Sequence, residues 1–130
     1  MHTETITYTD YNGVERTEDF RFNLTKAEAF EMEMSTAGGL SEKIKEITAT
    51  NDYPTLIKLF KNIVLKSYGV KSDDGRRFIK SDTISSEFEQ NPAFSIIYMK
   101  LATDDKAAAK FINGILPSEL TQKSSPAPKK

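Results

Sequence analysis

The densest cluster of charged side chains in the sequence lies in residues 65–81, LKSYGVKSDDGRRFIKS, between two apolar segments. Asp73 and Asp74 stand close to Arg76 and Arg77, and carboxylates beside guanidinium groups are residue types that acid–base catalysis or phosphate binding uses. However, Asp-Gly is a turn signal, and aspartates next to each other on a chain usually point apart. The pattern therefore favours a solvated turn or a protein contact surface over a catalytic pair.

Other residues that could carry chemistry are few. His2 is the single histidine, and its place beside the start methionine predicts a frayed terminal residue. Gly38 and Gly39 lack the lysine and serine of a phosphate-binding loop and indicate a turn between helices. The chain has no cysteine, so disulfides and thiolate metal sites are excluded. The sequence predicts no catalytic residue, no metal site and no cofactor, and hence no enzyme.

Length and charge narrow the class of protein further. A chain of 130 residues is most simply one domain, and its formal charge of −1 gives no strong attraction to nucleic acid or to an anionic membrane. The N-terminus lacks the basic and apolar regions of a signal peptide, and no apolar run reaches the length of a membrane span. We expect a protein of the cytoplasm that binds neither nucleic acid nor membrane.

The chain begins with a predicted β-hairpin over residues 3–22. Polar and apolar side chains alternate before and after Asn12-Gly13, and Asn-Gly supplies the two positive-φ positions that a tight hairpin turn requires. Phe20 and Phe22 share one face of the return strand, which should be the buried one. A two-stranded ribbon is marginal alone, so it must lie on helices or meet another chain.

Residues 25–117 have the pattern of about five or six short helices. Thr25 and Glu28 fit a capping box, Pro54 lies in the first turn of the most strongly apolar helix, and Gly69 stands where its C-terminal cap belongs. The predicted fold class is therefore α+β, mostly helical, with residues 1–117 forming one domain. Apolar side chains at helical spacing predict this core: Phe30, Leu56, Phe60, Ile63, Phe94, Ile97, Phe111 and Ile112.

Residues 118–130, SELTQKSSPAPKK, are polar, proline-bearing and basic, and they predict a disordered tail. Within the charged stretch, Val70 and the pair Phe78-Ile79 flank the turn and fit a short ribbon. Arginine is enriched where proteins meet, so the interpretation as a contact surface makes Arg76 and Arg77 its anchors. The candidate partner-binding residues are Arg76, Arg77, Phe78 and Tyr68.

Several segments together resemble the tail assembly chaperones of long-tailed bacteriophages. In that family a helix ending in Tyr-Gly leads to a Ser-x-Asp-Gly-Arg-Arg-Phe-x-Lys segment and, later, to an ending like Phe-Ile-x-Gly-Ile-Leu-Pro. The matching positions here are Tyr68-Gly69, residues 72–80 and residues 111–117. The N-terminal hairpin also fits, so the resemblance covers nearly the whole chain up to Pro117.

The resemblance implies an accessory protein of phage morphogenesis that is not an enzyme. It would bind the long, helical tape measure protein, and in addition the tail tube protein or a second copy of itself, and keep the tape measure protein soluble while the tail tube polymerises. It would act in the host bacterial cytoplasm and be absent from the mature virion. Two alternatives stay open: a structural virion protein of the tail or head–tail connector, and a small phage inhibitor of a host protein.

Overall fold

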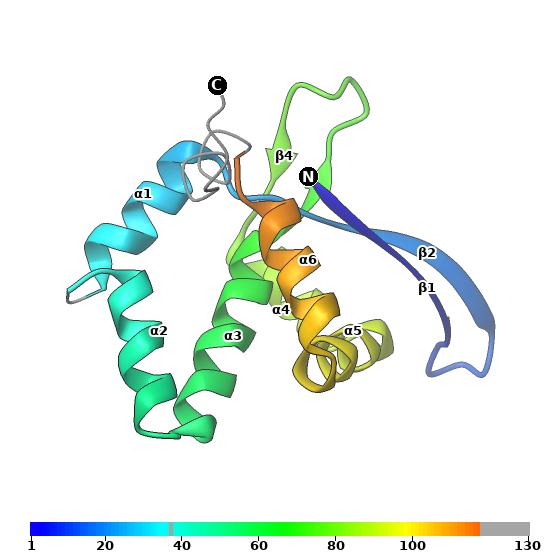
Figure 1. The fold of residues 1–130 in the computed structure, drawn as a ribbon. Helices are drawn as coiled ribbons and strands as arrows, with labels where there is room; N and C mark the ends of the chain where they lie inside the picture. Colours follow the sequence, from blue (N-terminus) through cyan, green and yellow to red (C-terminus); the bar gives the residue numbers. More distant parts are fainter. Residues whose placement is uncertain (37, 118–130) are drawn as a thin grey trace.

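The computed structural model describes residues 1–36 and 38–117. Six helices and four strands lie in this part of the chain, which confirms the α+β class with an N-terminal hairpin. The long hairpin lies on one side of the molecule, and α1 (Lys26–Ser35) and α2 (Leu40–Ala49) lie on the opposite side (Figure 1). Helices α3 (Tyr53–Ser67) and α6 (Asp105–Ile115) lie between them. None of these helices has the length and apolar character needed to cross a membrane. The predicted tail, residues 118–130, lies outside the described residues.

Strands β1 (His2–Thr9) and β2 (Glu15–Phe22) pair antiparallel along their whole length. Every second residue faces the helices, which buries Ile6 and Tyr8 of β1 together with Phe20 and Phe22 of β2. The opposite face carries threonines and charged residues and is exposed. The predicted alternation of the hairpin is therefore confirmed.

The hairpin turn differs from the expected two-residue turn. Gly13 has a φ of 82°, but Asn12 is not in the left-handed region. The loop instead includes all residues from Asp10 to Val14, and Asp10 Oδ1 accepts hydrogen bonds of 2.9 Å from the amides of Asn12 and Val14. Because the Asp10 side chain stabilises this longer loop, one left-handed residue is sufficient.

Two short strands extend the hairpin into a sheet with the order β1-β2-β3-β4. Strand β3 (Tyr68–Lys71) pairs with β2, and β4 (Phe78–Ile79) pairs with β3, which confirms the short ribbon expected from the sequence. The expectation that Gly69 forms the C-terminal cap of α3 is wrong, because this residue lies in β3. A Cβ atom there would lie 2.7 Å from the Phe78 ring, so the glycine permits a close approach of the two strands.

The helices begin at capping residues that the sequence indicates well. Thr25 forms the predicted capping box with Glu28, and Asp52, Asn91 and Asp104 cap later helices. The helices are α1 (Lys26–Ser35), α2 (Leu40–Ala49), α3 (Tyr53–Ser67), α4 (Asp82–Glu89), α5 (Pro92–Thr103) and α6 (Asp105–Ile115).

The core lies between the inner face of the sheet and helices α3 to α6. Aromatic rings dominate it: Tyr68 stacks on Phe88 with centroids 4.0 Å apart, and Phe22 meets Phe111 edge-on at 5.1 Å. Such ring pairs stabilise the fold beyond the area that they bury. The buried apolar residues are Ile6, Tyr8, Phe20, Phe22, Leu24, Ile63, Val64, Phe88, Ala93, Phe94, Ile97, Leu101, Phe111 and Ile115.

Four residues expected in the core are not fully buried, although Phe60 and Ile112 pack against it. The expectation for Phe30 is wrong: its side chain is 64% exposed, because α1 buries none of its residues. Leu56, Phe60 and Ile112 are only partly buried. These three side chains and Phe30 line an open groove, which explains why their apolar character does not lead to full burial.

The expected fraying of His2 is also wrong. His2 is the first residue of β1, and its ring packs edge-on against Phe111 with centroids 5.2 Å apart. Its Nε2 atom lies 2.6 Å from Glu4 Oε2, and Lys100 Nζ donates to the other oxygen at 3.0 Å. Burial raises the pKa of Glu4, but the hydrogen bonds with His2 and Lys100 outweigh it and lower this pKa below its ordinary value.

Candidate functional site

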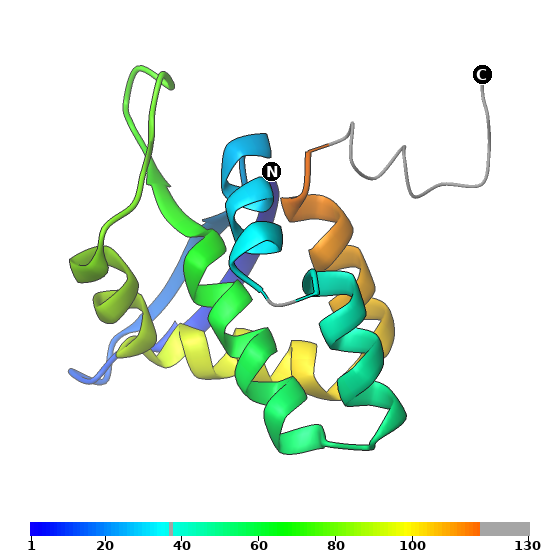
Figure 2. The same cartoon turned by 90° about the vertical axis from the view of Figure 1, so that its left-hand side faces the viewer.

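An apolar groove lies between four helices on the side of the molecule away from the hairpin tip. Residues of α1 and the first residue of α2 line one side, and residues of α3 and α6 line the other. Figures 1 and 2 show how these four helices are arranged. The groove has a volume of about 670 Å³, within the range of ligand-binding clefts. Its lining residues are Leu24, Lys26, Ala29, Phe30, Met32, Glu33, Leu40, Leu56, Leu59, Phe60, Ile63, Ile112, Ile115 and Leu116.

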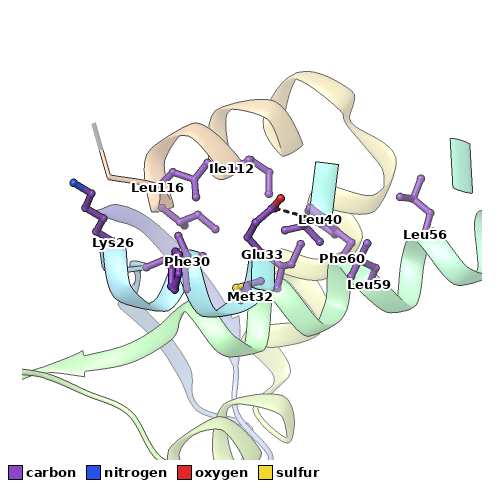
Figure 3. A pocket seen from close by; sticks show the side chains of 14 residues that line it. Lys26, Phe30, Met32, Glu33, Leu40, Leu56, Leu59, Phe60, Ile112 and Leu116 are labelled. Atoms are coloured by element: carbon purple, nitrogen blue, oxygen red, sulfur yellow. Dashed lines mark hydrogen bonds between the residues drawn. The ribbon is translucent and has the colours of Figure 1, made fainter. Parts of the chain in front are cut away.

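The lining is almost wholly apolar. Only Lys26 and Glu33 carry charge, and Figure 3 shows Lys26 at one end of the groove and Leu56 at the other. Glu33 Oε1 accepts a hydrogen bond of 2.9 Å from the amide of Leu40, so this carboxylate caps the first turn of α2. The groove can therefore bind apolar side chains, and its interior offers no nucleophile or acid–base pair.

Helix α1 is the least packed wall of the groove. Phe30 is 64% exposed and Met34, four residues later on the neighbouring surface, is 68% exposed. A soluble protein leaves such large side chains exposed at low cost when they are isolated, but here Phe30 adjoins a continuous apolar surface. Methionine adapts its shape to irregular partners, which suits Met32 and Met34 to a contact surface.

The N-terminal end of α1 is fixed by Lys80, the residue that follows β4. Lys80 Nζ donates to Asn23 O at 2.7 Å and to Glu28 Oε2 at 2.8 Å. Glu28 also accepts from the amide of Thr25. Burial raises the pKa of Glu28, but the hydrogen bonds from Lys80 and Thr25 together have the larger effect. The pKa of Glu28 therefore lies below its ordinary value. This network sets the direction in which α1 leaves the sheet.

A second candidate surface is the β3–β4 arm, defined as residues 72–77, which projects away from the helices (Figures 1 and 2). Its tip is held by internal hydrogen bonds: Ser72 Oγ donates to Asp74 Oδ1 at 2.7 Å and accepts from the amide of Arg77 at 3.0 Å. Bonds from the Arg76 amide and from Ser72 lower the pKa of Asp74. Asp74 therefore has a structural role, and the expectation of a turn is confirmed.

The arm separates the four predicted partner-binding residues into two groups. Arg76 and Arg77 are exposed at its tip, and neither guanidinium forms an ion pair within the described residues. Phe78 is half-buried at the base, beside Gly69. Tyr68 is also half-buried with its ring stacked on Phe88, and burial raises the pKa of its hydroxyl. Only the two arginines are thus placed for direct contact.

Sequence reasoning missed the groove because its residues have the pattern of a core. Leu56, Phe60 and Ile63 follow the helical spacing of a buried face, and nothing in that spacing tells an open groove from a filled one. One signal was present: residues 26–35, KAEAFEMEMS, carry Phe30 and two methionines, Met32 and Met34, among three glutamates, without a continuous apolar stripe. Such a helix buries little, which is what the structure shows.

No metal-binding group of three or more histidine, aspartate or glutamate side chains occurs in residues 1–36 and 38–117. A family model described as "Phage tail assembly chaperone" matches residues 1–129. This match agrees with the resemblance drawn from the sequence motifs. No curated protein and no solved structure matches the chain.

Proposed function

The chain belongs to the phage tail assembly chaperone family, and from this premise we propose that it binds the tape measure protein and keeps it soluble until the tail tube forms. A protein that must span the length of a tail exposes apolar surface before it is enclosed, and a chaperone can cover that surface. The observation that best supports this role is the apolar groove, since a folded domain rarely leaves such a surface unused.

The proposal assigns separate tasks to the two surfaces. The groove, with Phe30 and Phe60 on facing walls, binds apolar side chains of the partner and supplies most of the affinity. Arg76 and Arg77 at the tip of the arm add a polar contact, with the half-buried Phe78 and Tyr68 supporting the arm from below. Carboxylates of the partner are the natural ligands of two exposed guanidinium groups.

The same proposal covers the setting in which the protein acts. The chain works without catalysis or cofactor, in the host bacterial cytoplasm, and leaves the assembly before the virion matures. Residues 1–117 act as one domain, within which β3 and β4 interrupt the helices. The tail tube protein is a second candidate partner, and self-association is a further candidate interaction.

Co-expression in bacteria tests the role directly. We expect the tape measure protein to be soluble with this chain and to precipitate without it. Phe30→Ser should lower the soluble fraction several-fold with little change in folding, because the Phe30 side chain is already 64% exposed. Tyr11→Ser is the matched control: it also removes an exposed aromatic ring, but from the hairpin loop, remote from the groove.

Two outcomes would contradict the proposal. If the tape measure protein partitions equally between supernatant and pellet with and without the chain, the chaperone role on this partner fails. If purified virions contain the chain at high copy number by mass spectrometry, the alternative role of a structural virion component is favoured instead.

A further inference from the structure

We infer that the apolar groove recognises its partner as an amphipathic α-helix, lying with its C-terminal end toward Lys26, and does not recognise an extended segment. The inference rests on the proposed function for the identity of the partner. It adds the conformation, the length and the direction of the segment that is bound.

The chemistry of the walls selects a helix. Backbone N–H and C=O groups that leave water must find hydrogen-bond partners, and an unpaired group costs a large part of the binding free energy. Both walls are built mainly from helices, whose interior backbone groups are already paired, and the amides of Leu24 and Leu116 outside the helices donate to Ile115 O and Ile112 O. The one polar side chain in the middle of the groove, Glu33, is bonded to the amide of Leu40. An extended segment would lose its backbone hydrogen bonds here, whereas a helix keeps its own.

The dimensions of the groove set the length of the segment. Its lining runs along α3 from Leu56 to Ile63 and along α1 from Lys26 to Glu33. Each stretch covers eight residues, and the seven steps between its ends amount to about 10 Å, or two turns, at the rise of an α-helix. A partner helix of two to three turns therefore fills it, with apolar residues at positions i, i+3, i+4 and i+7 facing the walls.

Charge at the ends of the groove sets the direction. Lys26 is the only cationic residue of the lining and lies at one end, while the other end, at Leu56, is apolar (Figure 3). The C-terminus of a helix carries the negative end of its dipole, so it is stabilised beside a lysine and the N-terminus is not. An acidic residue in the last turn of the partner helix would add to this effect.

Composition argues against the chain's own C-terminal residues as the occupant. Residues 118–130 begin two positions after the lining residue Leu116, so their place in the sequence would allow them to reach the groove. However, they offer one large apolar side chain, Leu120, and they contain two prolines and three lysines. Prolines oppose a helix, and a single large apolar side chain cannot form an apolar stripe along one. A separate protein with an apolar helical stripe is the better match.

Synthetic peptides of about 20 residues that tile the tape measure protein test the inference with the full-length chain, by fluorescence anisotropy. We expect the bound peptides to carry apolar residues at i, i+3, i+4 and i+7. Proline at a central, solvent-facing position should weaken binding more than about tenfold, while alanine at the same position should change it less than about twofold. Equal binding of the proline and alanine peptides would overturn the inference.

Direction is tested by moving one glutamate from the last turn of a bound peptide to its first turn. With the native chain the C-terminal glutamate should bind about two- to fivefold more tightly, and with Lys26→Glu this order should reverse. An unchanged order in Lys26→Glu would overturn the assigned direction.

A dimer of the chain that dissociates in Phe30→Ser would show a second copy as the occupant and overturn the inference. Failure of the proposed function looks different, because then no peptide binds and co-expression has no effect.

Discussion

Lys80 Nζ donates a hydrogen bond of 2.8 Å to Glu28 Oε2 and thereby connects the residue after β4 to the first turn of α1, across 52 positions of sequence. The same ammonium group donates to Asn23 O, just before the helix begins. Since α1 buries none of its own residues, these contacts and the capping box at Thr25 hold its N-terminal end in place. One lysine side chain therefore positions a wall of the groove.

Lys80→Met should loosen that wall. Methionine keeps much of the apolar stem but loses both hydrogen bonds, so the free energy of unfolding should fall by about 1 kcal/mol. Hydrogen exchange measured by mass spectrometry should accelerate in α1 more than in α3. Lys61→Met is the matched control, because its ion pair with Glu89 is well exposed on both sides and should contribute less. Unchanged exchange in α1 would show that Lys80 does not position it.

Phe60 and Phe111 should respond differently to truncation. The sequence alone suggests a loss of about 3–5 kcal/mol for Phe60→Ala, as for a buried ring. In the structure Phe111 is fully buried, whereas Phe60 is partly open to the groove. We therefore expect the loss of about 3–5 kcal/mol for Phe111→Ala and a smaller loss of about 1–2 kcal/mol for Phe60→Ala. Urea unfolding of both variants measures the difference. Equal losses would mean that the groove is closed in solution.

The sequence predicts the local elements of this fold well because their signals are local. Thr25 and Glu28 are three residues apart, and the cap that they form depends on nothing else. Asp52, Asn91 and Asp104 likewise cap the helices that follow them. The alternation in β1 and β2 also survives, because a strand with one buried face permits only one register.

The errors come from tertiary contacts. Gly69 resembles a helix cap until the pairing of β3 with β2 and β4 is known. His2 looks like a frayed terminus because its partners, Glu4 and the distant Phe111, are not evident from its position. The groove is the clearest case: helical spacing shows which face of α3 is apolar, but only the placement of α1 shows that this face is left partly uncovered.

Glu4 should make the fold sensitive to acid. Its pKa is lower in the folded chain than the ordinary 4.5, so the unfolded chain binds the proton more readily. The stabilisation is therefore present above about pH 4.5 and is lost as the pH falls through the folded value. The difference in unfolding free energy between the native chain and Glu4→Gln should shrink from neutral pH to acid. Glu15→Gln, on the exposed face of β2, is the control for the loss of one negative charge from the hairpin.

Gly69→Ala should destabilise the sheet. The new Cβ would lie 2.7 Å from the Phe78 ring and 2.9 Å from Ile79 O, and the second contact is to backbone, which cannot rotate away. We expect a loss of about 1–3 kcal/mol, typical of overpacking. Val70→Ala is the control, because this neighbouring side chain is 45% exposed in the same strand. Thermal unfolding gives the comparison, and a melting temperature equal to that of the native chain would contradict the predicted clash.

Arg76 and Arg77 should contribute to partner binding and not to folding. Both are exposed at the tip of the arm, and its hydrogen bonds use their backbone amides and leave the guanidinium groups aside. The double change to alanine should therefore leave the melting temperature within about 1–2 °C. Because an arginine that anchors an interface contributes about 2 kcal/mol or more, capture of the tape measure protein should weaken at least tenfold.

The double change to lysine keeps the charge but loses the planar fork and should recover only part of the capture. Full capture by the alanine variant would leave the groove as the sole contact, and a large drop in its melting temperature would assign the arginines to folding.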